Sequence, residues 1–127
     1  MARHEGRTEH APKPVAAYSQ AIRVGNVVSI AGQCGFDPKT DRLVEGGVGA
    51  ETLQALRNAD AALQSCGASL DDVVRVDIVL ADIAEFVEMN EAYGTVWSAP
   101  YPTRTTVAAQ LVGPPRVEIT VLAVVAE

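Results

Sequence analysis

Histidine and cysteine are scarce in this sequence of 127 residues. The two histidines, His4 and His10, lie near the N-terminus, where no neighbouring side chain completes a metal-ligand set. The two cysteines, Cys34 and Cys66, are too few for a disulfide framework or a zinc site, which indicates free thiols in a reducing compartment. Cys34 has no histidine outside the N-terminal residues to activate it, and this disfavours covalent cysteine catalysis. We therefore expect no metal site.

Positive charge and long apolar runs are also limited. Ten basic residues against 16 acidic residues give a net charge of −6, which argues against nucleic-acid binding because phosphate contacts need a concentrated positive field. No stretch approaches the roughly 18 apolar residues of a membrane span, and residues 1–10 lack the apolar core of a secretory signal. The expectation is a cytoplasmic protein with neither a nucleic-acid nor a membrane partner.

The length and the apolar content predict one self-supporting domain. Hydrophobic residues make up 48% of the chain, and a folded protein of 13.4 kDa buries roughly two-thirds of the surface of its unfolded chain. Residues 1–14 are polar and end in two closely spaced prolines, so we expect a flexible N-terminal arm there, followed by a single domain over residues 15–127.

Apolar periodicity predicts the element order ββ-α-β-α-ββ and an α+β fold, with two helices on one face of a single sheet. Gly25-Asn26 marks a hairpin turn that sets Val24 opposite Val27 and Ile22 opposite Ser29. The remaining predicted elements are a helix over 51–66 closed by Gly67, a strand within 71–81 with Val74, Val76, Ile78 and Leu80 on one face, a helix starting at Asp82 with Glu85 as its capping partner, and strands within 103–111 and 117–126.

The sheet face opposite the helices is expected to mix charged and apolar side chains. A solvated sheet surface is one interpretation, and a subunit interface that encloses a site is the other. Arg104 can grip a carboxylate through two parallel hydrogen bonds, and Glu118 can position or deprotonate a water. A structural ion pair of Arg104 with Glu118 or Asp77 is the competing interpretation. This face is predicted to carry Arg75, Asp77, Arg104, Thr106, Glu118 and Thr120, interleaved with Leu122 and Val124.

A series of short motifs resembles the RidA (YjgF, reactive intermediate deaminase) family. In chain order they are Ala-Tyr-Ser-Gln-Ala-Ile, Ile-Ala-Gly-Gln, Asp-Pro-Lys-Thr, Asn-Glu-Ala-Tyr, Tyr-Pro-Thr-Arg-Thr-Thr-Val and Val-Glu-Ile, from about Ala16 to Ala126. The resemblance implies a chorismate-mutase-like fold with a mixed sheet. It also implies a homotrimer whose sheets form a central barrel, with a small-ligand site between subunits and no cofactor.

The resemblance also implies roles for the catalytic residues. Arg104 corresponds to the arginine that binds the substrate carboxylate, and Glu118 corresponds to the acid that positions the attacking water. Thr106 stands where the family usually has a cysteine whose main-chain carbonyl holds that water, and a threonine supplies the same carbonyl.

Four further residues are implied to bind substrate. Tyr18 and Asn90 correspond to residues that line the cleft. Ala31 and Gly32 come directly after the predicted hairpin and are implied to line the substrate site. The family usually carries a serine at the position of Ala31, so this chain lacks that hydroxyl.

Deaminase-type members hydrolyse reactive enamines and imines, such as 2-aminoacrylate and 2-iminopropionate, to 2-keto acids and ammonia, and the resemblance implies this activity. The alternative is a non-catalytic trimer that binds a small carboxylate or a partner protein, which the departures at Ala31 and Thr106 favour. Some relatives carry an endoribonuclease label, but the acidic balance of this chain and its lack of a basic stripe count against that activity.

Overall fold

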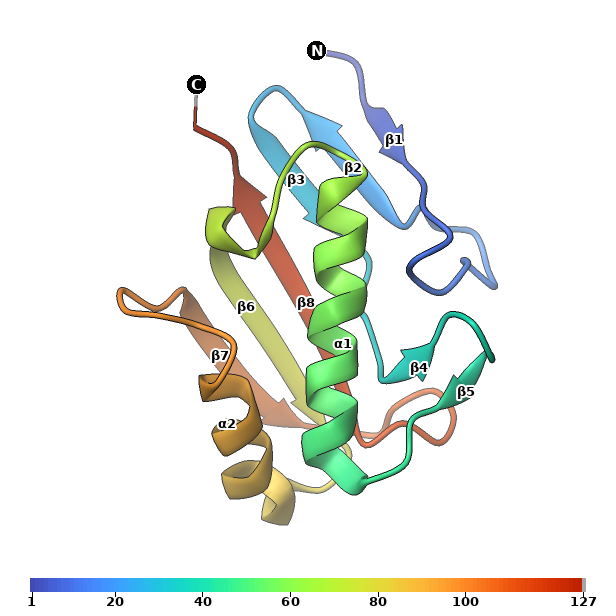
Figure 1. The fold of residues 1–127 in the computed structure, drawn as a ribbon, viewed down its shortest axis with the longest axis vertical. Helices are drawn as coiled ribbons and strands as arrows, with labels where there is room; N and C mark the ends of the chain where they lie inside the picture. The colour runs from blue at the N-terminus through green and yellow to red at the C-terminus, as the bar shows by residue number, and fades with distance from the viewer. Residues whose placement is uncertain (127) are drawn as a thin grey trace.

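The computed structural model describes residues 1–126, in which two α-helices cover one face of a six-stranded mixed sheet (Figure 1). The strand order is β1-β2-β3-β8-β6-β7; β6 and β7 run parallel, and the other neighbours are antiparallel. The predicted α+β class is thus confirmed. The elements are β1 (His4–Gly6), β2 (Ala21–Val24), β3 (Val27–Ile30), β4 (Phe36–Asp37), β5 (Arg42–Leu43), α1 (Gly47–Gln64), η1 (Leu70–Asp72), β6 (Val73–Leu80), η2 (Ile83–Glu85), α2 (Phe86–Gly94), β7 (Thr103–Ala108) and β8 (Val117–Val124).

The β2–β3 hairpin has the predicted register. Val24 pairs with Val27 and Ile22 with Ser29 across the two-residue turn. Gly25 has a φ of 56°, a left-handed conformation that glycine adopts at little steric cost. Beyond the hairpin, β4 and β5 form a small separate sheet that the sequence did not predict.

Helix α1 supplies the helical side of the core. Its buried residues include Ala55, Leu56, Ala59 and Leu63, which pack against the inward-facing side chains of β6 and β8. Burying each large aliphatic side chain contributes about 1.5–3 kcal/mol. The helix begins four residues earlier than predicted and ends at Gln64, ahead of a left-handed Gly67. No helix within residues 1–126 has the length and apolar character needed to span a membrane.

Strand β6 contains an irregularity that alters one predicted core position. Val76, Ile78 and Leu80 are buried as expected, but the pairing of β6 with β8 shifts register between Val73 and Arg75. The shift places Val73 in the core and leaves Val74 45% exposed. The prediction for Val74 is therefore wrong, because strict alternation does not hold across a bulge.

The second helix begins later than its sequence signal indicated. Asp82 caps the short 3-10 helix η2, and α2 follows only at Phe86. Glu85 does not act as the predicted capping partner, since its carboxylate pairs with Arg116 at 3.0 Å. Trp97 lies beyond the end of the helix, but its ring still packs on Tyr93, with 5.6 Å between the ring centroids.

The N-terminal residues do not form the flexible arm that we expected over residues 1–14. His4–Gly6 form the edge strand β1 and pair with β2. Ala11 is only 1% exposed. The expectation is wrong because a short polar segment can be ordered by a single well-placed side chain, which here is Gln20 on the neighbouring segment.

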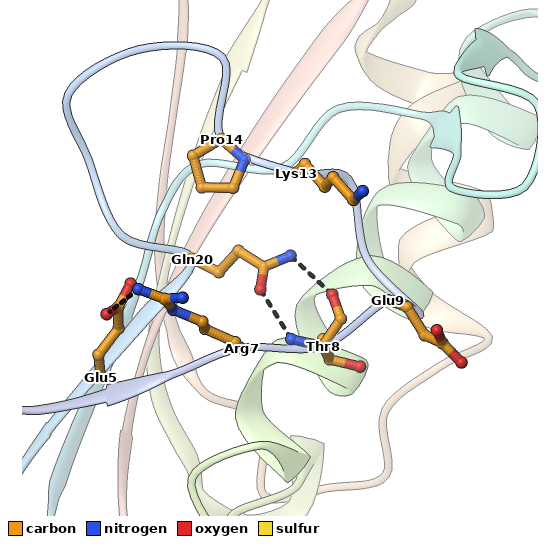
Figure 2. Close-up of a pocket in the computed structure, with 7 residues that line it drawn as sticks. All are labelled: Glu5, Arg7, Thr8, Glu9, Lys13, Pro14 and Gln20. Carbon is orange, nitrogen blue, oxygen red and sulfur yellow. Dashed lines mark hydrogen bonds and ion pairs between the residues drawn. The ribbon is translucent and has the colours of Figure 1, made fainter.

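The carboxamide of Gln20 organises this segment (Figure 2). Gln20 is 4% exposed; its oxygen accepts from the Thr8 main-chain nitrogen at 2.8 Å, and its nitrogen donates to the Thr8 carbonyl at 3.0 Å. The same nitrogen also lies 3.2 Å from the Ala11 carbonyl and 2.9 Å from the Pro12 carbonyl. One buried amide therefore satisfies main-chain groups that would otherwise need water.

Replacing Gln20 with leucine is expected to lower the free energy of unfolding by about 1–3 kcal/mol, because it leaves buried main-chain groups without partners. Amide hydrogen exchange should accelerate at Thr8 in the same variant. Gln64→Leu is the matched control, since Gln64 is exposed and its substitution should change the stability by less than about 0.5 kcal/mol. Equal stabilities of the two variants in urea denaturation would contradict this role.

Candidate functional site

Alternate side chains of β7, those of Arg104 and Thr106, point toward the helices. In the parallel pairing with β6, Arg104 lies beside the buried Val76 and Thr106 lies beside the buried Ile78. Both side chains therefore lie on the helix-covered face of the sheet. The prediction that they share the opposite face is wrong because the polar positions of this edge strand face α2, whereas Val107 is 48% exposed on the other face.

Glu118 lies on the opposite face, as predicted. It pairs with Val79 across β6 and β8, whereas the next residue, Ile119, is fully buried among the core residues. Because side chains alternate along a strand, Arg104 and Glu118 of one chain lie on different faces of the same sheet. No ion pair between these two residues is present, and they form parts of two separate concavities.

Asp77 is also not a partner of Arg104. Its two carboxylate oxygens accept hydrogen bonds from Arg75, at 2.9 and 3.1 Å. Within residues 1–126, no carboxylate oxygen lies within the 4.0 Å ion-pair distance of the Arg104 guanidinium. The structural ion pair that competed with a binding role for Arg104 is therefore absent.

Arg104 is held instead by α2. Its Nη1 donates to Asn90 Oδ1 at 2.7 Å, and its guanidinium carbon lies 4.8 Å from the ring centroid of Tyr93 and 5.7 Å from that of Phe86. The aromatic faces attract the cation and fix its plane without using its hydrogen-bond donors. Most of the five N–H donors of Arg104 thus stay free for a planar anion.

A concavity of about 350 Å³ opens beside this guanidinium. We call it the arginine half-site, and Asn90, Tyr93, Gly94, Tyr101, Pro102 and Arg104 line it. Burial raises the pKa of Tyr93, and the positive charge of Arg104 lowers it to a smaller extent. The hydroxyl therefore stays neutral, and Arg104 remains the charged group of this half-site.

Sequence reasoning assigned Tyr93 to the core and missed its contact with Arg104. The signal was the spacing, because Asn90 and Tyr93 are three residues apart and share one face of α2. Phe86 lies on the same helix and completes the aromatic surroundings of the guanidinium. Helix α2 thus provides the hydrogen bond and both aromatic rings that orient Arg104.

A second concavity, of about 440 Å³, surrounds Glu118. We call it the glutamate half-site, and its lining includes Tyr18, Ala31, Gly32, Cys34 and Glu118. A methyl group on Gly32 would lie 2.9 Å from Cδ of Glu118, so a side chain at this position would displace the Glu118 carboxylate from its present place. Of the predicted substrate-binding residues, Tyr18, Ala31 and Gly32 gather here, whereas Asn90 belongs to the arginine half-site.

The thiol of Cys34 is the part of this half-site for which sequence reasoning found no role. Its Sγ lies 3.7 Å from Oε1 of Glu118. Burial raises the pKa of Cys34 to about 12, with smaller contributions from the negative charges of Glu118 and Glu51. A thiol with this pKa stays protonated near neutral pH, which makes it a poor nucleophile.

A buried carboxylate at the start of α1 anchors the loop that borders the glutamate half-site. Glu51 is 4% exposed and accepts a hydrogen bond from the Arg116 main-chain nitrogen at 2.9 Å. The Arg116 side chain reaches Glu51 at 3.7 Å and Glu85 at 3.0 Å. The loop preceding Arg116 contributes Val112 and Pro115 to the half-site lining. The sequence separation of Glu51 and Arg116 hid this contact from pattern analysis.

The described residues 1–126 contain no group of three or more His, Cys, Asp or Glu side chains placed to hold a metal ion. Among residues 1–126, the charged groups that line the two concavities are the Arg104 guanidinium in the arginine half-site and the Glu118 carboxylate in the glutamate half-site. These two groups can bind an anion and accept a proton, respectively.

Comparison with known proteins finds a matching family model, similar sequences and similar solved structures. The family model for Endoribonuclease L-PSP matches residues 8–125. A RutC family protein of Pyrococcus abyssi is 43% identical over 107 residues, 84% of each chain. The 2-iminobutanoate/2-iminopropanoate deaminase of Rattus norvegicus is 39% identical over 118 residues, 92% of this chain and 86% of that protein. The crystal structure of RidA from the Antarctic bacterium Psychrobacter sp. is 40% identical, covers 97% of this chain and 100% of its own, and superposes with a TM-score of 0.89.

Proposed function

Because this chain belongs to the RidA/YjgF family, we propose that it hydrolyses small 2-imino acids and their enamine tautomers to 2-keto acids and ammonia. The substrates would be of the 2-iminopropanoate, 2-iminobutanoate and 2-aminoacrylate type. The proposal is supported by the identity with the rat 2-iminobutanoate/2-iminopropanoate deaminase. A ribonuclease activity is not proposed, since a net charge of −6 does not suit binding to a polyanion.

The observation that carries the proposal is that the Arg104 guanidinium is held in place by uncharged neighbours. The Arg104 guanidinium lies over two aromatic rings, is hydrogen-bonded to Asn90 and has no carboxylate partner within residues 1–126. It therefore retains free donors beside a concavity. A small carboxylate is the ligand that matches this planar fork in charge and geometry. A 2-imino acid presents such a carboxylate next to its reacting carbon.

The placement of Arg104 and Glu118 on different faces of one sheet implies how the site would be completed. A site that uses both residues needs two copies of the chain, one for each half-site. We therefore propose a homotrimer with a site at each subunit boundary, as the family resemblance implies. The partly exposed Val107 and Val124 on the uncovered sheet face support association, because such side chains are commonly buried in subunit interfaces.

The proposed reaction requires mainly that the site hold the substrate carboxylate and place one water beside the imine carbon. Arg104 would bind the substrate carboxylate. Glu118 of the adjacent subunit would take a proton from a water molecule while the oxygen of that water adds to the imine carbon. Glu118 would pass that proton to the nitrogen, so that the C=N bond becomes a C–N single bond in a neutral tetrahedral carbinolamine. The proton of the carbinolamine hydroxyl would then move to the nitrogen, again through Glu118, as the C=O bond forms, the C–N bond breaks and ammonia leaves. Thr106 would offer its main-chain carbonyl to the water, and Tyr18, Ala31, Gly32 and Asn90 would line the substrate.

The proposed function is tested by adding the purified protein to imines that an amino-acid oxidase generates in situ, with semicarbazide to trap the remaining imine. Addition of the protein should lower the yield of semicarbazone and raise the rate of keto-acid formation above that of the free solution. A protein that binds a 2-keto acid at Arg104 without any acceleration would support the alternative of a non-catalytic carboxylate-binding protein. No acceleration and no binding would refute both proposals.

A further inference from the structure

The two carboxylate oxygens of Glu118 face different neighbours. Oε1 lies 3.7 Å from the Cys34 thiol. Oε2 lies against Gly32, where a methyl group would come within 2.9 Å of it. Because glycine has no side chain, Oε2 fits against Gly32 in the glutamate half-site without a hydrogen-bond partner among residues 1–126, while Oε1 has the thiol as its partner.

Main-chain hydrogen bonds fix the segment that carries both neighbours. The Gln33 nitrogen donates to the Ile119 carbonyl at 2.8 Å, and the Ile119 nitrogen donates to the Gln33 carbonyl at 2.8 Å. This reciprocal pair locks residues 32–34 in register with β8, one residue away from Glu118. The thiol and the carboxylate are therefore held together by the sheet rather than by a mobile loop.

The buried Asn58 of α1 holds the same segment from the helical side. Its side-chain nitrogen donates to the carbonyl of Cys34 at 3.1 Å and to that of Phe36 at 2.8 Å, and its oxygen accepts from Gln54 at 2.9 Å. Asn58 is fully buried, so these bonds are protected from water. The backbone at Cys34 is thus fixed from two sides, which is what a side chain needs in order to orient another group.

The protonation states suit a hydrogen bond from sulfur to oxygen. Burial raises the pKa of Cys34 to about 12, with smaller contributions from the charge and hydrogen bond of Glu118 and from the charge of Glu51. The thiol therefore keeps its proton and acts as a donor, while an ionised carboxylate can only accept.

We propose that Cys34 is a positioning residue for Glu118: its thiol donates to Oε1, so that Oε2 is the oxygen that takes the proton from the attacking water. This inference rests on the proposed function, because it assigns different roles to the two oxygens of the carboxylate that acts there as the base. It adds a residue to the site without giving Cys34 any contact with the reacting atoms.

Two substitutions separate the hydrogen bond from simple packing. Cys34→Ala removes the donor, and kcat should fall about three- to tenfold with KM nearly unchanged, as expected for the loss of one ordinary hydrogen bond. Cys34→Ser retains a donor and should return kcat to within about twofold of the wild type. Cys66→Ala, at a thiol that lines neither half-site, is the control and should not change kcat. Equal kcat in the wild type and Cys34→Ala, or equal losses in the alanine and serine variants, would overturn the proposal.

An infrared measurement tests the contact independently of turnover. In a Cys66→Ala background, the S–H stretching band reports on Cys34 alone, and it should move to higher frequency when Glu118→Ala removes the acceptor. An unchanged band would show that the contact is absent and would overturn the proposal. If the band moves but the wild-type protein does not hydrolyse imines, the proposed function fails and the role of Oε2 fails with it, while the thiol–carboxylate contact stands.

Discussion

Arg104→Ala is expected to lower kcat/KM for 2-iminopropanoate by about a hundredfold or more. Among residues 1–126, Arg104 is the one cation that lines the arginine half-site. The substitution removes this charge together with the planar fork that would orient the substrate carboxylate. Both the binding and the alignment of the imine carbon should suffer, so KM should rise and kcat should fall. Steady-state rates in the semicarbazide assay measure both constants.

Two variants show whether the fall in kcat/KM comes from losing the paired donors of the guanidinium. Arg104→Lys keeps the positive charge but loses the paired donors, and it should recover only part of the activity. Arg57→Ala removes an exposed arginine of α1 that lines neither half-site, and it should leave kcat/KM unchanged. Wild-type kcat/KM in Arg104→Ala would move carboxylate recognition to another residue and would contradict the proposed site.

Glu118→Gln is expected to lower kcat by about 10²- to 10⁴-fold, the usual range for loss of a general base. Glutamine keeps the size of the side chain, and its oxygen can still accept from Cys34, but the amide cannot take a proton from water. KM should change little, because the substrate carboxylate is assigned to Arg104. Light scattering after size exclusion should give the same trimer mass for the variant and the wild type.

Glu91→Gln is the matched control for this prediction. Glu91 is an exposed residue of α2 that lines neither half-site, so its amide variant should keep wild-type kcat. If Glu118→Gln retains kcat, another group deprotonates the water and the glutamate half-site loses its chemical role. A monomer mass for the wild type would instead refute the shared site.

Much of the fold could be predicted from the sequence, because local chemistry determines it. The Gly25-Asn26 turn fixed the pairing of β2 with β3, and the repeat of Leu56, Ala59 and Leu63 identified the buried face of α1. These signals depend on residues close together in the chain. Arg104 was predicted as a carboxylate-binding residue from its residue type and its place on a strand, and the resemblance to a family implied the same role.

The faces of the sheet could not be assigned in the same way. Alternation along β7 separates Arg104 and Thr106 from Val107, but it does not say which set faces the helices. The pattern suggested that the apolar set is the core side, whereas the structure turns Val107 away from the helices and places Arg104 against α2. Only the pairing with β6 and the contacts of α2 decide this, and both join residues far apart in the sequence.

The central claim is that Arg104 and Glu118 act together across a subunit boundary, and hybrid assemblies test it directly. Arg104→Ala and Glu118→Gln chains, each nearly inactive alone, are unfolded, mixed in equal amounts and refolded together. If each site takes Arg104 from one subunit and Glu118 from its neighbour, random trimers should regain about a quarter of the wild-type kcat per site, since one site in every mixed trimer is intact. Activity no higher than that of the two parent variants, in mixed trimers confirmed by mass, would contradict the account.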